Sequence, residues 1–114
     1  MSDSTSLITQ MRKGAIEYCV LALLRGGERY GYEMVQALSK VDGMLVTEGT
    51  IYPLLGRLKR DGLVMTELRE SEAGRARRYY RLLPEGEAAL AEFIRQWGTF
   101  TCAVDTILHQ GDAL

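Results

Sequence analysis

Basic side chains gather in one part of this 114-residue chain, residues 57–81. That segment holds eight Lys or Arg and four Asp or Glu, a net charge of +4, although the whole chain has a formal net charge of −1. Guanidinium and ammonium groups pair with phosphate oxygens, and for binding nucleic acid a local basic patch matters more than the total charge. The cations that we expect to reach a nucleic acid are Arg57, Lys59, Arg60, Arg75, Arg77 and Arg78.

The first three of these cations lie in the stretch TEGTIYPLLGRLKRDGLV, residues 47–64. Its apolar side chains recur at intervals of three and four residues, which is typical of an amphipathic helix with one buried side. Thr47 can cap this helix, and Gly62 suits the position just after its end. If Thr50 is the cap instead, Pro53 falls in the first turn at little cost, and the sequence does not choose between the two. The predicted buried residues are Ile51, Leu54, Leu55 and Leu58.

The opposite side of the same helix is almost without side chains, because Gly49, Pro53 and Gly56 lie along it. Each glycine costs a helix about 1 kcal/mol relative to alanine, and a proline past the first turn removes a backbone donor. We interpret this smooth side as clearance that lets the helix approach the major groove of DNA closely. The candidate DNA-binding residues of the helix besides its cations are therefore Thr47, Gly49, Thr50, Tyr52 and Pro53.

The rest of the pattern predicts three further helices and a hairpin. Two β-like runs, LVMTELRE and RRYYRLL, flank the turn-rich loop SEAGRA, so the hairpin has a basic tip. Three helices followed by a hairpin form a winged helix-turn-helix, a mainly α fold with a small β-hairpin. The predicted elements are helices over residues 9–25 (Thr9 to Arg25), 32–41, 47–61 and 84–109, and strands over residues 63–70 and 77–83.

The last predicted helix, which Pro84 opens, carries two apolar stripes. One stripe has the heptad spacing of a coiled-coil seam and contains Leu90, Ile94, Trp97, Thr101, Val104 and Leu108. The other stripe contains Phe93, Phe100 and Ile107. Two stripes predict two partners, the first helix of the same chain and another subunit, because a monomer would expose too much apolar surface. We therefore divide the chain into a winged helix-turn-helix domain, residues 1–83 with residues 1–8 disordered, and a dimerisation helix, residues 84–114.

Three stretches, YGYEMVQAL, TEGTIYPLLGRLKRDGLV and GRARRYYRLLPEGEAAL, resemble the PadR family of bacterial transcriptional regulators. The resemblance covers about residues 11–108 and implies a homodimeric winged-helix repressor whose last helix forms the dimer. It further implies a palindromic operator and release by a small phenolic or drug-like effector. Leu83 stands where the family commonly has a Thr that caps the last helix, so a frayed first turn is expected there. The family's DNA contacts fall on Lys13, Tyr32, Thr50, Tyr52, Arg57 and Arg77.

Trp97, the only tryptophan, lies in the middle of the heptad seam with Gly98 beside it. It is either a residue of the dimer core or a ring that lines a cavity and stacks with flat aromatic ligands. The resemblance implies the second role, because in the short, multidrug-binding branch of the family a tryptophan at this position stacks with ligands between the subunits. Most of the other pocket positions differ from that branch, so the identity of the ligand does not carry over. The implied pocket residues are Met11, Ala15, Tyr18, Ile94, Trp97 and Thr101.

Other classes of function have less support in the sequence. His109 is the only histidine, and the chain shows neither a nucleophile–base pair nor zinc-ligand spacing, so we expect no enzyme, metal site or cofactor. Cys19 and Cys102 are expected to be buried thiols, and the start of the chain lacks the features of a signal peptide, which favours a cytoplasmic protein. Two alternatives stay open: a DNA-binding regulator without a small-molecule effector, and a winged helix that binds only other proteins.

Overall fold

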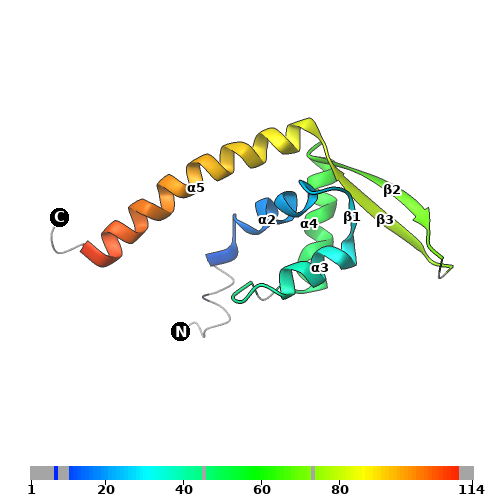
Figure 1. Cartoon of the computed structure of the whole chain (residues 1–114), viewed down its shortest axis with the longest axis horizontal. Helices are drawn as coiled ribbons and strands as arrows, with labels where there is room; N and C mark the ends of the chain where they lie inside the picture. Colours follow the sequence, from blue (N-terminus) through cyan, green and yellow to red (C-terminus); the bar gives the residue numbers. More distant parts are fainter. Residues whose placement is uncertain (1–6, 8–10, 45, 73, 111–114) are drawn as a thin grey trace.

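The computed structural model describes residues 7, 11–44, 46–72 and 74–110. It has the predicted fold class, a mainly helical winged helix-turn-helix with a small antiparallel sheet and a long C-terminal helix (Figure 1). The elements in chain order are α2 (Ile16–Leu24), β1 (Arg29–Tyr30), α3 (Gly31–Ser39), α4 (Glu48–Arg60), β2 (Val64–Glu70), β3 (Ala76–Leu82) and α5 (Pro84–Gln110).

The first predicted helix is interrupted in the structure. Residues 11 and 12 are helical, residues 13–15 form a turn, and α2 begins only at Ile16. Gly14 has a φ of +88°, the left-handed conformation that ends helices. The prediction of one helix from Thr9 to Arg25 is therefore wrong, although Thr9 itself lies outside the described residues, as do all of residues 1–8 except residue 7.

The hydrophobic core joins the three short helices to the sheet and to the start of α5. The four apolar residues predicted to face inward from α4 are all buried, which confirms the orientation of that helix. Each such side chain contributes about 1.5–3 kcal/mol through its removal from water. The largest fully buried side chains of this core are Leu21, Met34, Ile51, Leu55, Leu58, Val20 and Val64.

The ends of α4 are defined by backbone hydrogen bonds. The Thr47 carbonyl accepts from the N–H groups of Thr50 and Ile51, both at 3.1 Å, so Thr47 is the N-cap, although its side chain makes no capping hydrogen bond. Pro53 therefore lies inside the helix, where it leaves the carbonyl of Gly49 without its helical donor.

At the other end, Gly62 takes the predicted position after the helix with a φ of +77°. Its N–H donates to the Lys59 carbonyl, and the Leu63 N–H donates to the Leu58 carbonyl at 3.0 Å. These two bonds form a Schellman motif, which satisfies carbonyls that the helix end leaves open.

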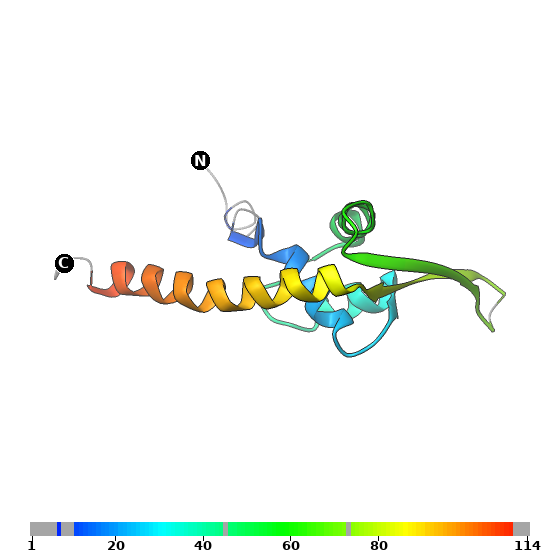
Figure 2. The ribbon, with the colours of Figure 1, turned by 90° about the horizontal axis from the view of Figure 1, so that it is seen from above.

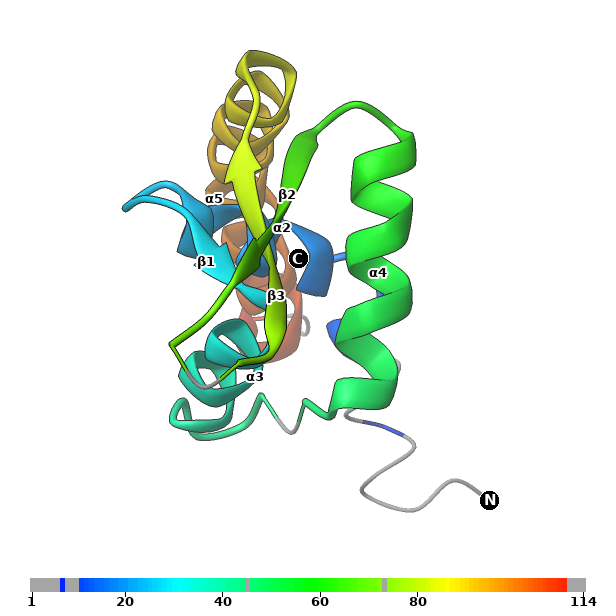
Figure 3. The same ribbon diagram turned by 90° about the vertical axis from the view of Figure 1, so that its right-hand side faces the viewer.

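The sheet has three antiparallel strands in the order β1–β3–β2. The hairpin of β2 and β3 pairs from Val64 with Leu82 to Glu70 with Ala76, as the two β-like runs predict. The two-residue strand β1 was missed, because two residues are too short to show an alternating pattern. Figure 3 shows α4 beside β2, with α3 near the lower end of α4.

Helix α5 has 27 residues and leaves the body of the molecule along its longest dimension, which is 61 Å. The hairpin and the C-terminal end of α5 lie at opposite ends of that axis (Figure 2). Cys102, on the projecting part, is exposed rather than buried as expected, while Cys19 is partly buried, and both are free thiols. Within the described part of the chain, no helix has the length and apolar character needed to cross a membrane.

The start of α5 is packed against the turn that follows α4. The Leu63 carbonyl accepts from the Leu83 N–H at 3.0 Å, and the Glu87 N–H donates to the Leu83 carbonyl at 2.9 Å, so the first turn is hydrogen-bonded without a capping side chain at Leu83. Gly86 is buried there, and a Cβ atom added to it would lie 2.2 Å from the Leu63 oxygen. The close approach of α5 to this turn therefore requires glycine.

Gly86→Ala is expected to lower the free energy of unfolding by about 1–3 kcal/mol, because backbone or helix must move to admit the methyl group. The matched control is Gly56→Ala, a helical glycine with nothing within 4 Å of the added Cβ. The control is expected to stabilise the fold by up to about 1 kcal/mol through helix propensity. Urea unfolding at one fixed protein concentration measures both, and equal stability of the two variants would contradict the packing role of Gly86.

Candidate nucleic-acid interface

The outward side of α4 is as bare as its sequence predicts. Gly49, Pro53 and Gly56 are exposed, and a Cβ added to either glycine would meet no atom closer than 3.7 Å. A second surface can therefore approach this side of the helix closely. The polar and basic candidates around it, all exposed, are Thr47, Thr50, Tyr52, Arg57, Lys59 and Arg60.

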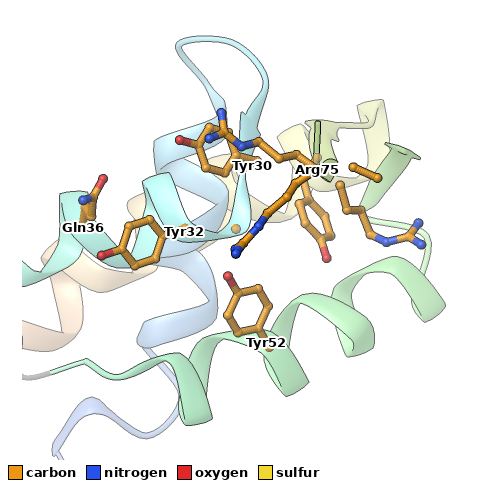
Figure 4. A pocket seen from close by; sticks show the side chains of 10 residues that line it. Tyr30, Tyr32, Gln36, Tyr52 and Arg75 are labelled. Atoms are coloured by element: carbon orange, nitrogen blue, oxygen red, sulfur yellow. The ribbon is translucent and has the colours of Figure 1, made fainter. Parts of the chain in front are cut away.

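A cavity of about 460 Å³ lies where the N-terminus of α3, the first half of α4 and the hairpin meet (Figure 4). Figure 4 shows Tyr32, Tyr52 and Arg75 around it, with the Arg75 side chain extending toward Tyr52. The cavity brings together five predicted DNA-binding residues: Tyr32, Tyr52, Arg75, Arg77 and Arg78. Its other lining residues, which the sequence analysis did not include, are Tyr30, Gly31, Gln36, Ala76 and Tyr80.

Three arginines of the hairpin line this cavity, but different neighbours hold their side chains. Arg77 and Arg78 are consecutive in β3 and so point to opposite faces of the sheet. The Arg77 guanidinium lies 4.4 Å from the centre of the Tyr30 ring, a cation–π contact. Arg78 donates from Nη1 to Thr66 Oγ1 at 3.0 Å. Each side chain is thus held in place by a different neighbour, and Arg75 lies exposed at the tip.

A charged cluster on one face of the sheet ties the hairpin to the turn before β1. Arg69 Nη2 donates to Glu28 Oε2 at 2.8 Å and to Glu67 Oε2 at 3.2 Å. Its guanidinium also lies 4.6 Å from the centre of the Tyr79 ring. The hydrogen bonds from Arg69 lower the pKa of both carboxyls, and the two carboxylates raise the pKa of Arg69. The cluster therefore ties the outer half of the hairpin to the turn before β1.

Tyr52 and Tyr80 are both neutral hydroxyl groups near pH 7. Partial burial, followed by the charges of Glu48 and Tyr32, raises the pKa of the Tyr52 phenol above its usual value. Burial likewise raises the pKa of the Tyr80 phenol, and the Arg78 guanidinium opposes this shift. A neutral phenol both donates and accepts hydrogen bonds, so Tyr52 can bond a phosphate oxygen or a base edge.

Two predicted contacts lie apart from the cavity. Arg57 is half exposed and forms an ion pair with Glu17 of α2, with 3.7 Å between Nη2 and Oε2. An exposed pair of this kind is worth at most about 1 kcal/mol, so a phosphate can compete for Arg57. Lys13 lies exposed in the turn before α2 and lines a different cavity, beside α5.

That second cavity, of about 540 Å³, lies between the turn before α2 and the middle of α5. Aromatic rings form a row along it. Tyr18 of α2 stacks on Phe93 with 4.1 Å between ring centres, Trp97 follows at 5.3 Å from Phe93, and Phe100 at 6.4 Å from Trp97. The lining residues are Met11, Lys13, Gly14, Ala15, Phe93, Gln96, Trp97 and Phe100.

The residues predicted to bind a ligand do not all line the same cavity. Met11, Ala15 and Trp97 line the aromatic cavity, whereas Tyr18 contributes through its stack with Phe93. Ile94 lines a separate cavity of about 390 Å³ with Arg25, Leu82, Glu87, Leu90 and Ala91. Thr101 donates its hydroxyl to the Trp97 carbonyl at 2.9 Å and does not line the aromatic cavity.

The predicted dimer seam also divides, because Leu90 is only 3% exposed and belongs to the core of its own chain. The prediction that Leu90 belongs to the dimer seam is therefore corrected, because its own chain already covers it. Beyond it, α5 exposes large apolar side chains that no described element covers. They are Ile94, Trp97, Phe100, Ile107 and Leu108, with exposed fractions from 43% to 70%.

Comparisons with known proteins agree with the architecture. The model of the transcriptional regulator PadR-like family matches residues 20–92. The chain is 41% identical over 83 residues to the transcriptional regulator Rv3488 of Mycobacterium tuberculosis, covering 73% of this chain and 76% of that protein. A PadR-like transcriptional regulator from Bacillus cereus is 38% identical with a TM-score of 0.77, covering 88% of this chain and 97% of the other. A PadR family regulator from Eggerthella lenta is 32% identical with a TM-score of 0.82, covering 92% and 91%.

The charged cluster at Arg69 makes a prediction about pH. Its hydrogen bonds lower the pKa of Glu28 in the folded state, so they stabilise the fold fully above the unfolded pKa of about 4.3. This stabilisation is lost as the pH falls through the lowered value. Wild type is therefore expected to exceed Glu28→Gln in stability at pH 7 and to equal it near pH 2. Thermal unfolding across this pH range measures the difference.

The control repeats the Glu28→Gln comparison in an Arg69→Gln background, where the hydrogen-bond donor is absent. There the pH-dependent effect is expected to shrink to the small part that the charge of Arg81 contributes. A stability difference that persists in acid, or that is undiminished by the loss of Arg69, would show that Glu28 acts by some other means.

Proposed function

The chain is a member of the PadR-like family of transcriptional regulators, and we propose that it is a homodimeric repressor of a palindromic operator, modulated by a planar aromatic molecule. As a family member it is a DNA-binding regulator and not an enzyme. The observation that carries the proposal is the convergence of Tyr32, Tyr52 and the hairpin arginines on one cavity beside the bare side of α4.

In the proposed complex, α4 enters the major groove with its bare side toward the bases. Gly49, Pro53 and Gly56 keep that side flat, so the backbone comes close to the base edges. Thr50 and Tyr52 then bond bases or phosphates, while Lys59 and Arg60 at the end of the helix pair with phosphates. The hydroxyl oxygen of Thr47 lies 3.5 Å from that of Thr50, so Thr47 contacts the same part of the DNA as Thr50.

The hairpin acts as the wing beside this helix. Arg75 at the tip and Arg78 on one face reach the DNA backbone or the minor groove, where arginine binds favourably. Arg77, held over Tyr30, presents its charge at the same cavity. Arg57 exchanges Glu17 for phosphate, and Lys13 contacts the backbone from the turn before α2.

In the proposed homodimer, residues 84–114 are the part of the chain that contacts the second subunit. The exposed apolar residues of α5 would be costly to leave in water, and a second copy of the helix would cover them. We place Ile94, Trp97, Thr101, Val104 and Leu108 at this interface. A two-fold dimer sets two copies of α4 about 34 Å apart, one turn of DNA, which suits a palindrome.

The effector would bind in the aromatic cavity between the turn before α2 and α5. Its row of rings offers flat faces for stacking, and Met11 and Ala15 close its other side. A ligand that separates α2 from α5 would alter the spacing of the two DNA-binding units and thereby weaken operator binding. Occupation of the operator by the dimer excludes other proteins from the same DNA, which is the proposed means of repression.

Substituting Arg75, Arg77 and Arg78 together by Gln is expected to reduce the salt dependence of DNA binding. Each lost phosphate contact lowers the slope of log affinity against log salt by about 1, so the reduction should reach about 2–3. The DNA is first selected from a random pool with the wild-type protein, and binding is then measured at several salt concentrations. Arg25→Gln, an exposed arginine distant from the cavity, is the matched control and should keep the wild-type slope. An unchanged slope in the triple variant, or a selection that enriches no palindrome, would contradict the proposal.

Planar aromatic dyes are expected to quench the fluorescence of Trp97, the single tryptophan, and to weaken operator binding. Sedimentation of the free protein should give the mass of two chains. A flexible aliphatic amine of the same charge serves as the control ligand. If no dye in a panel changes the Trp97 emission or the DNA affinity, the proposed aromatic effector is contradicted. The protein would then be a DNA-binding regulator without such an effector.

A further inference from the structure

The first residue of α3, Gly31, is buried beneath the ring of Tyr52 in α4. A Cβ atom added to Gly31 would lie 2.5 Å from Cε1 of that ring and 3.2 Å from both Cζ and the hydroxyl oxygen. Carbon atoms do not approach one another this closely without a bond, so the edge of the ring occupies the space that any other side chain at Gly31 would need.

The backbone at Gly31 does not itself require glycine. Its φ is not positive, unlike those of Gly14 and Gly62, and the first position of a helix accepts most residue types. The glycines of α4 differ in another way, because an added Cβ at Gly49 or Gly56 would face open space. Gly31 is therefore the glycine on this face whose missing side chain makes room for a proposed DNA-binding residue.

The position of the Tyr52 ring determines what its hydroxyl can do. Tyr52 is 44% exposed, so its ring is covered in part, and the edge of the ring that faces Gly31 is on the covered side. Resting on Gly31, the ring lies across the start of α3, on the same cavity as Tyr32 and the hairpin arginines (Figure 4). The raised pKa of the Tyr52 phenol agrees with a ring held partly out of water beside Glu48 and Tyr32.

We propose that Gly31 is a positioning residue for DNA recognition, which acts by seating the ring of Tyr52 so that its hydroxyl meets the DNA together with Tyr32 and Arg75. The inference rests on the proposed function, in that α4 and the hairpin form the DNA-binding face. Gly31 itself makes no contact with DNA. A larger residue at this position turns the ring outward, where it obstructs the approach of the groove and loses its hydrogen bond.

The test is a double-mutant cycle on DNA affinity with Gly31→Ala, Tyr52→Ala and the double variant. Gly31→Ala is expected to weaken binding to the selected palindrome by roughly ten-fold, the effect of losing one good hydrogen bond to a charged group. If Gly31 acts through Tyr52, the double variant binds as tightly as Tyr52→Ala alone, because without the ring the methyl group meets nothing. Gly26→Ala, a change in the turn after α2 with nothing within 4 Å of the added Cβ, is the control for a glycine substitution as such.

A second readout requires no DNA. Titration of ¹³Cζ-labelled tyrosine by NMR should show the pKa of the Tyr52 phenol falling toward about 10 in Gly31→Ala, since the displaced ring becomes solvated. Assignment comes from the resonance that disappears in Tyr52→Ala. An unchanged phenol pKa would show that the ring has not moved and would overturn the proposal.

The remaining outcomes separate the inference from the proposed function. Wild-type protein that binds no DNA overturns the proposed function, and the positioning role falls with it. Normal wild-type binding with full affinity in Gly31→Ala, or a double variant clearly weaker than Tyr52→Ala, overturns the positioning role alone. If Gly31→Ala does not fold, the DNA affinities of Tyr52→Ala and the double variant still test the positioning role. Both variants lack the Tyr52 ring, so neither contains the clash between that ring and a methyl group at position 31. Equal affinity supports the proposal and a further loss overturns it.

Discussion

The burial of one side of α4 is the contact on which the rest of the structure depends. Ile51, Leu55 and Leu58 are completely buried, so the helix cannot rotate about its axis without exposing them. Because side chains on a helix have fixed directions around it, this burial also determines which residues face outward. The bare stripe of Gly49, Pro53 and Gly56 is therefore held in the open by the same contacts that stabilise the core.

Close approaches at two glycines connect α4 to its neighbours. Near its start, the Tyr52 ring rests on Gly31 of α3, and just after its end, the Leu63 carbonyl abuts Gly86 of α5. Both contacts bring elements nearer than a Cβ atom allows. The contact at Gly86 involves the backbone of the turn after α4, which adjusts less readily than a side chain, whereas the contact at Gly31 is made by the ring of Tyr52.

The sequence predicted the elements best where the pattern was long and regular. The side of α4 that faces the core, the two strands of the hairpin and the long α5 follow from periodicity, which local residue types express directly. The errors have local causes. A positive φ at Gly14 interrupts a stretch that is apolar enough to be one helix, and β1 is two residues long. Leu90 has heptad spacing, yet its position near the start of α5 places it inside its own chain's core.

What the sequence determined by itself is the order of elements, the basic character of residues 57–81 and the bare side of α4. These properties depend only on residues that are close together along the chain, so the sequence is enough to predict them. Only the tertiary structure decided that Tyr32, Tyr52 and Arg75 share one cavity, that Arg77 and Arg78 have different neighbours, and that the ring of Tyr52 occupies the space above Gly31. Those relations join residues from three elements, and they exist because burying the core brings α3, α4 and the hairpin to one point, which no local pattern records.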